Sequence, residues 1–133
     1  MTTYPPASMP EDLSRMFVER FNSGDADGLA ALYEPEAILA MPPGQPTSGR
    51  QAIPEFYARR LANRPHFTGD IQRALVNGDL ALTSVLYETN ITDAAGQTMR
   101  VRTASAEVAR RQPDGFWLWT IIDLPNPLQP RAQ

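Results

Sequence analysis

The chain has no cysteine, no lysine and only one histidine among its 133 residues. The absence of cysteine excludes disulfides, thiol nucleophiles and thiolate metal sites. A transition-metal site usually needs two or three clustered ligands, and His66 is the single histidine, so we expect no metal. His66 follows Arg64-Pro65 at the expected start of a strand, which favours a surface position over a catalytic one. We also expect no cofactor, because the sequence contains no glycine-rich phosphate loop and no nucleophile elbow.

Excess positive charge and long apolar runs are also lacking. The 12 basic residues, all arginine, stand against 15 acidic ones and give a net charge of -3. This mild acidity argues against a nucleic acid or an anionic membrane as partner. No apolar run approaches the length of a membrane span, and the first ten residues lack the pattern of a signal peptide. We therefore expect a cytoplasmic protein without a membrane partner.

The composition that is present is that of a globular domain. Hydrophobic residues make up 42% of the chain and charged residues 20%, both near the average for folded proteins. A chain of this length forms one domain and can bury a core without disulfides. We predict a single domain over residues 1–133, with its core at about 10–124 and tails at 1–8 and 125–133.

The first half of the chain carries helix signals. Ser8 followed by Glu11 fits a capping box at the start of a first helix, which Gly24 ends. Asp25 is placed to cap a second, short helix, and Pro35 is expected to stop it.

A short apolar strand and a third helix follow. Residues 37–41 are too short for a helix and too apolar for a loop, which predicts a buried strand. A loop rich in proline and glycine leads to the third helix, which starts near Arg50 and buries Ile53, Phe56 and Tyr57.

The second half of the chain changes to strands. Four are predicted, at about residues 66–76, 80–91, 99–111 and 116–124, and their connections are glycine-containing turns. Successive hairpins make an antiparallel meander, and helices followed by strands indicate an α+β fold with the helices on one face of the sheet.

The last strand is apolar on both faces, because residues 116–122 contain a single polar side chain, Thr120. Three helices can cover one face only. Two tryptophans, Trp117 and Trp119, would make a large exposed patch on a monomer, so we predict a homodimer through the outer sheet face. The alternative is a monomer in which loops and the C-terminal tail cover that face.

The segment from Phe17 to Leu61 orders these elements as helix, Gly-Asp break, short helix, apolar strand ending in Pro-Pro-Gly, and Ser-Gly-Arg before a third helix. This order resembles the ketosteroid isomerase and SnoaL-like polyketide cyclase superfamily, whose fold is that of nuclear transport factor two. The resemblance covers about residues 10–124. It implies three helices packed on a strongly curved, mostly antiparallel sheet, a cone-shaped barrel with a pocket for an apolar small molecule. It also implies pairing of two copies through the convex face.

The resemblance assigns each functional position of the isomerases to a residue of this chain. The general base of the isomerases falls on Met41, and the oxyanion-hole tyrosine of the first helix falls on Phe17. A thioether accepts no proton at neutral pH and a phenyl ring donates none, so these two changes argue against that isomerase chemistry. The supporting tyrosine is retained as Tyr57, and the second, acidic oxyanion donor falls on or next to Glu107.

Glu107 is the leading candidate for a catalytic residue. The face of the sheet on which its side chain lies depends on the strand register. Alternation puts Glu107 and Arg102 on opposite faces of one strand. If Glu107 faces the cavity, burial raises its pKa and it can act as an acid or hydrogen-bond a ligand. If a bulge reverses the register, Glu107 is a solvated partner of arginines and Arg102 lines the pocket.

The other candidates come from the strand ends and the pocket walls. Asp123 ends the last strand and is either a pocket acid or a cap for the following turn. Arg102 is either a partner of these acids or a surface residue. Tyr33 and Trp119 are predicted wall residues, which core packing alone also explains.

Two functions remain open at this point. The first is binding of an apolar ligand in a pocket lined by Phe17, Met41, Tyr57 and Trp119. If the protein is an enzyme, it would carry out isomerisation, cyclisation or dehydration without a cofactor. Glu107 would then be the acid or base and Tyr57 a hydrogen-bond donor. The second is a non-catalytic dimerisation or ligand-sensing module of the same fold.

Overall fold

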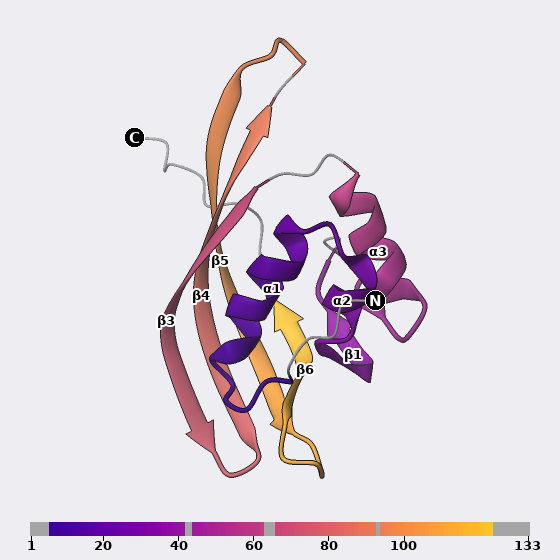
Figure 1. The fold of residues 1–133 in the computed structure, drawn as a ribbon, viewed down its shortest axis with the longest axis vertical. Coiled ribbons are helices and arrows are strands. Elements are labelled where there is room, and N and C mark those ends of the chain that lie inside the picture. Colours follow the sequence, from indigo (N-terminus) through magenta and orange to yellow (C-terminus); the bar gives the residue numbers. More distant parts are fainter. Residues whose placement is uncertain (1–5, 42–43, 63–65, 93, 124–133) are drawn as a thin grey trace.

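The computed structural model describes residues 6–41, 44–62, 66–92 and 94–123 (Figure 1). The predicted C-terminal tail and most of the predicted N-terminal tail lie outside these residues. Three helices and six strands are present in the described part of the chain, in the order α1 (Asp12–Asn22), α2 (Ala26–Ala30), β1 (Tyr33–Leu39), β2 (Thr47–Ser48), α3 (Ala52–Leu61), β3 (Phe67–Asn77), β4 (Leu80–Thr92), β5 (Thr98–Arg111) and β6 (Trp117–Asp123).

The capping box predicted from Ser8 and Glu11 does not form, because Glu11 makes no capping hydrogen bond. The Asp12 carboxylate instead accepts from the Ser8 hydroxyl at 3.3 Å and from the Met9 backbone N–H at 3.1 Å, in the turn that precedes α1. The cap of α2 is confirmed, because Asp25 accepts from the Gly28 N–H at 2.9 Å.

Pro35 does not stop a helix, as the sequence had suggested; it lies inside β1, which begins four residues earlier than predicted. The register of β1 against β6 is interrupted between Tyr33 and Ile38, and Pro35 lies in this interruption. A proline has no N–H for the sheet, so an irregular stretch is where a strand can hold one.

The six strands form one sheet in the order β2-β1-β6-β5-β4-β3. Only β1 and β6 pair in parallel, whereas the other neighbours are antiparallel. The sheet curves around the helices, which all lie on its inner face, and the β4–β5 hairpin extends beyond them (Figure 1). The predicted α+β cone is therefore confirmed.

The core fills the space between the helices and the inner face of the sheet. Both tryptophans of β6 belong to it, with Trp117 5% and Trp119 1% exposed. The expectation of exposed tryptophans is thus wrong, because residues two apart in a strand share a face and this pair points toward the helices. Leu118 and Ile121 lie on the outer face instead, where Ile121 is 47% exposed.

Candidate functional site

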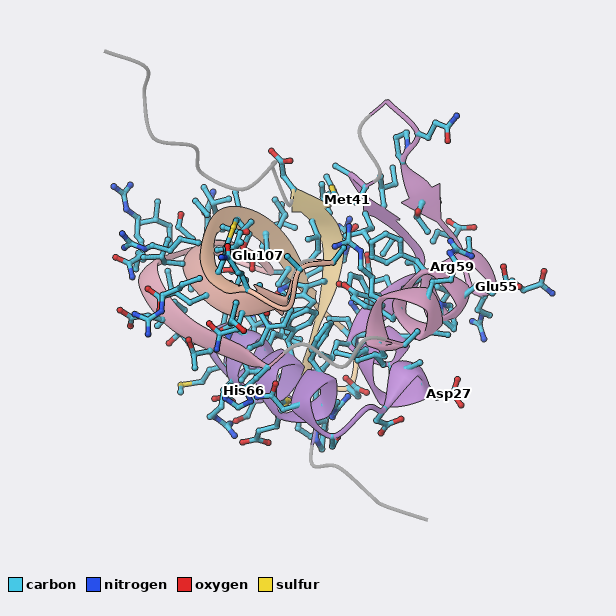
Figure 2. The ribbon with its side chains drawn as sticks, turned by 90° about the horizontal axis from the view of Figure 1, so that it is seen from above. Asp27, Met41, Glu55, Arg59, His66 and Glu107 are labelled. Carbon is cyan, nitrogen blue, oxygen red and sulfur yellow. The ribbon has the colours of Figure 1, made fainter. Side chains whose placement is uncertain are left out.

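Glu107 is a buried acid in the middle of the sheet. It lies on β5, opposite Thr83 of β4 and Ile122 of β6, and is only 1% exposed. The inward register is thus the one the chain adopts. Viewed from above, Glu107 lies within the curl of β4 and β5, and Glu55 lies on the side of the helices (Figure 2).

Three hydroxyl groups hold the Glu107 carboxylate. Ser105 Oγ donates to Oε1 at 2.8 Å, and Tyr87 Oη donates to the same oxygen at 3.3 Å. Thr83 Oγ1 donates to Oε2 at 3.2 Å. Both carboxylate oxygens are thereby hydrogen-bonded, as a buried charge requires.

The environment of Glu107 brings its pKa close to neutrality. Burial raises the pKa of this carboxyl from 4.5 to about 7, and the hydrogen bonds from Ser105, Thr83 and Tyr87 oppose that rise. The side chain therefore exchanges a proton near neutral pH. Burial also raises the pKa of the Tyr87 phenol, and the adjacent Glu107 raises it further, so Tyr87 remains a donor.

A pair of tyrosines lies beside this acid. The hydroxyls of Tyr33 on β1 and Tyr57 on α3 are hydrogen-bonded to each other, and both side chains are buried. Burial raises the pKa of both phenols, which keeps them neutral. One hydroxyl donates to the other, so the pair retains one proton that it can donate to a further acceptor.

Aromatic rings close the space around these polar groups. Phe17 of α1 meets Tyr57 edge-on at 5.8 Å and Trp119 at 5.9 Å between ring centroids. The indole Nε1–H of Trp119 is buried and has no hydrogen-bond partner among the described residues. The remaining cavity measures only about 10 Å³, and it is lined by Phe17, Tyr33, Tyr57, Tyr87, Glu107, Trp119 and Ile122.

Five of the predicted site residues therefore meet at one cavity: Phe17, Tyr33, Tyr57, Glu107 and Trp119. Met41 does not line it; the half-buried Met41 packs at the margin of the core instead. Asp123 is exposed and lies opposite Ala106 on the outer face. Arg102 is exposed as well and forms an ion pair with Glu88 at 3.4 Å, so it lies outside the pocket. His66 is exposed, in agreement with the surface position expected for it.

The sequence interpretation did not single out Thr83 and Tyr87 as partners of the acid. Both lie on β4, and their contact with Glu107 depends on the pairing of β4 with β5. The signal was present, because the predicted strands end at 91 and begin at 99, and counting eight residues away from this pair on each strand brings Thr83 opposite Glu107. Ser105 lies two residues before Glu107 and therefore on the same face of β5.

Two negative findings apply to the part of the chain that the structure describes. Within it, no group of three or more histidine, cysteine, aspartate or glutamate side chains is placed to hold a metal ion. None of the described helices has both the length and the apolar character needed to cross a membrane.

Comparisons with known proteins find the same fold in other proteins. The sequence profile of the SnoaL-like domain matches residues 14–117. A ketosteroid isomerase-like protein from Erwinia carotovora atroseptica has a TM-score of 0.75 at 19% identity, covering 90% of this chain and 94% of that chain. A nuclear transport factor 2-like superfamily protein from Salmonella enterica has a TM-score of 0.72 at 17% identity, covering 89% and 88%. A domain of unknown function with a cystatin-like fold from Nostoc punctiforme has a TM-score of 0.75 at 21% identity, covering 89% and 75%. At these identities the structural likeness shows the fold alone.

Proposed function

This chain belongs to the SnoaL-like family, and we propose that it binds a small apolar molecule with an acceptor oxygen beside Glu107 and exchanges a proton with it. The observation that carries the proposal is the burial of Glu107 among three hydroxyl donors, with a pKa of about 7. A group with this pKa both gives and takes a proton at neutral pH. The reaction class it serves is isomerisation, cyclisation or dehydration without a cofactor.

The cavity has more hydrogen-bond donors than acceptors available to a ligand, which is why we propose a ligand with an acceptor oxygen. Trp119 contributes an unpaired N–H, and the Tyr33–Tyr57 pair contributes one hydroxyl proton. Both carboxylate oxygens of Glu107 already accept hydrogen bonds from the protein. The site thus has spare donors, and a carbonyl oxygen of a ligand would accept from them.

Binding requires the cavity to open. Its volume of about 10 Å³ holds one water at most, whereas ligand pockets usually have about 300–1,000 Å³. Phe17 lines this space, and its ring contacts those of Tyr57 and Trp119. A ligand would displace this ring, and the interactions it makes must offset the lost aromatic contacts.

The same small volume favours a second candidate function, a non-catalytic module whose interior is simply filled. In that case Glu107 would be a polar residue satisfied by Thr83, Tyr87 and Ser105, and the cavity would admit no organic molecule. The two candidates therefore differ in whether a carbonyl compound enters at all.

The test uses cyclohexanone, acetophenone and 2-tetralone as probes, with methylcyclohexane, toluene and tetralin as counterparts without the oxygen. Binding is measured by calorimetry. Proton transfer is measured by NMR in heavy water, as exchange of deuterium into the carbon next to the carbonyl group. We expect a ketone to bind more tightly than its hydrocarbon counterpart and to exchange in the presence of the protein.

Glu107→Gln is the decisive variant and Glu55→Gln the matched control, because Glu55 is exposed on α3. Exchange should be lost in the first variant and kept in the second. Failure of every ketone to bind would contradict the proposal and support the non-catalytic module. Binding without exchange, or equal exchange in Glu107→Gln, would contradict the proposed proton transfer.

A further inference from the structure

Tyr87 of β4 joins the buried acid to the cavity. Its side chain is 2% exposed and lines the cavity, and its hydroxyl donates to Glu107 Oε1 at 3.3 Å. Ser105 and Thr83 also donate to the acid, but neither is among the described residues that line the cavity. Of the described residues that do line it, Trp119 and the tyrosine pair make no hydrogen bond to the acid. Within the described part of the chain, Tyr87 is therefore the one donor that Glu107 and a ligand can share.

The carboxylate can lose the hydrogen bond from Tyr87 and still have both of its oxygens bonded. Oε1 of Glu107 accepts from two hydroxyls, and Ser105 Oγ at 2.8 Å is closer than Tyr87 Oη at 3.3 Å. Hydrogen bonds between two oxygens usually measure about 2.5–3.0 Å, so the bond from Tyr87 is the weaker of the two. Oε2 accepts from Thr83. If Tyr87 turns its hydroxyl toward a ligand, each oxygen of the acid keeps one donor.

The other titratable groups that face Glu107 stay neutral near pH 7. They are phenols on three different elements: Tyr87 of β4, Tyr33 of β1 and Tyr57 of α3. Burial raises the pKa of each of these phenols. The cavity residues that come from α1 and β6 have no titrating group: Phe17, Trp119 and Ile122. Glu107 is thus the group in this cluster whose charge changes near neutral pH.

A ligand that accepts from Tyr87 changes the charge of Glu107. Burial raises the pKa of Glu107, and the hydrogen bond from Tyr87 is one of three that oppose this rise. A ligand oxygen that takes the Tyr87 hydroxyl removes one of these opposing bonds, so the pKa of Glu107 rises further. Because this pKa is already about 7, a further rise makes the carboxylate bind a proton at neutral pH.

We propose that the acceptor oxygen of the ligand takes the Tyr87 hydroxyl from Glu107, and that Glu107 takes up one proton from solvent in exchange. This inference rests on the proposed function and adds Tyr87 as a residue that touches the ligand. One hydroxyl donor leaves the carboxylate and one proton replaces it, while no other bond forms or breaks. Ligand binding and proton binding then strengthen each other by the same factor.

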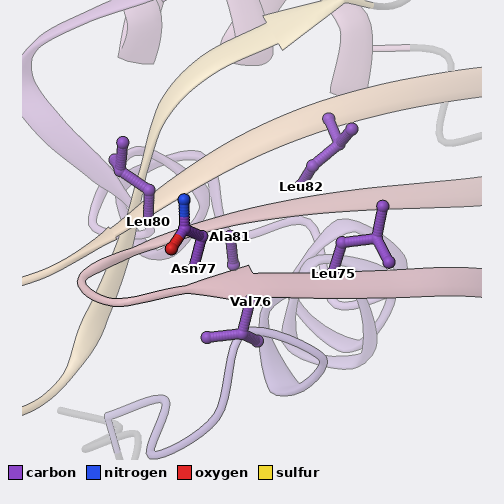
Figure 3. Close-up of a pocket in the computed structure, with 6 residues that line it drawn as sticks. All are labelled: Leu75, Val76, Asn77, Leu80, Ala81 and Leu82. Atoms are coloured by element: carbon purple, nitrogen blue, oxygen red, sulfur yellow. The ribbon is translucent and has the colours of Figure 1, made fainter.

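A larger hollow on the surface offers no such link to the acid. It measures about 210 Å³ and lies at the β3–β4 hairpin (Figure 3). None of the described residues that line it is ionisable: Leu75, Val76, Asn77, Leu80, Ala81 and Leu82. An apolar probe that binds there would cause no proton uptake. The hollow therefore requires a control variant, and Leu82→Ser is suitable because Leu82 is 42% exposed.

Calorimetry in buffers with different enthalpies of ionisation counts the protons taken up on binding, with 2-tetralone as the probe. A hydrogen bond to a charged group changes the proton affinity of that group about tenfold. The wild type should therefore take up about half a proton per ligand at pH 7.5, and it should bind about eightfold more weakly at pH 9 than at pH 6. Tetralin, which lacks the oxygen, should bind without proton uptake.

Three variants separate Tyr87 from its neighbours. Tyr87→Phe keeps the ring and should abolish the proton uptake. Ser105→Ala should take up at least as much as the wild type, because Ser105 holds the same oxygen of the acid without lining the cavity. Leu82→Ser should behave as the wild type does.

NMR of the Glu107 carboxyl carbon gives a second readout on the wild type alone, since its titration midpoint should rise when 2-tetralone is bound. Ketone binding without proton uptake, an unchanged midpoint, or equal uptake in Tyr87→Phe would overturn this inference and leave the proposed function standing. A wild type that binds no ketone would overturn both.

Discussion

Replacement of Glu107 by glutamine should change how the stability of the protein depends on pH. The pKa of Glu107 is about 7 in the folded chain, against 4.5 for a free glutamate. The folded state therefore binds the proton more tightly than the unfolded state. The resulting stabilisation is fully present below pH 4.5, declines as the pH rises toward 7, and is absent above pH 7.

The size of this effect follows from the same two values. The difference between a pKa of about 7 and one of 4.5 corresponds to about 3 kcal/mol between the ends of that pH window. Glutamine carries no titrating proton, so the Glu107→Gln variant lacks this contribution. The free energy of unfolding of the variant, minus that of the wild type, should rise by about 3 kcal/mol between pH 4 and pH 8.

Urea unfolding followed by circular dichroism measures this difference at steps of half a pH unit, at one fixed protein concentration. A constant offset is expected in addition, because an amide cannot accept from all three hydroxyls as a carboxylate does. The offset cancels in the comparison across pH. Glu55→Gln, at an exposed position, is the control variant. A difference that stays constant to within about 0.5 kcal/mol from pH 4 to pH 8 would refute the account of Glu107.

Three further changes test the surroundings of the site by chemical denaturation. Phe17→Ala removes a buried ring that lines the cavity and should cost about 3–5 kcal/mol; a loss below about 1 kcal/mol would show that the ring is not tightly packed. Gly69→Ala should cost about 1–3 kcal/mol, since the added Cβ would lie 2.9 Å from the Tyr87 ring, and an unchanged stability would contradict that contact. Asp25→Ala removes the cap of α2 and should cost about 1 kcal/mol, whereas Asp25→Asn should retain most of the stability.

The fold could be predicted from the sequence mainly because its turns are chemically distinctive. Gly78, Gly96 and Gly115 each adopt a positive φ, and they lie in the turns that connect β3 to β4, β4 to β5 and β5 to β6. The order of elements between Phe17 and Leu61 also indicated the family, and the domain match confirms that resemblance. Strand β1 was misplaced because Pro35 normally signals an end, whereas an irregular pairing with β6 accommodates it here.

The candidate site could be predicted only in part. Glu107 was identified, but its direction depended on a register that one bulge could have reversed. Met41 was expected in the pocket by analogy of position, and the structure leaves it outside the cavity lining. The hydroxyls of Thr83 and Tyr87 are brought to the acid by strand pairing, which a reading of single segments does not contain.

The central claim is that Glu107 changes its protonation state near pH 7, and NMR of the side-chain carboxyl carbons measures this directly. With ¹³C-labelled glutamate, one carboxyl resonance of the wild-type chain should titrate with a midpoint near pH 7, and that resonance should be missing from Glu107→Gln. The account predicts this midpoint because burial outweighs the three hydrogen bonds to the carboxylate. A Glu107 resonance that titrates at or below pH 4.5 would contradict it.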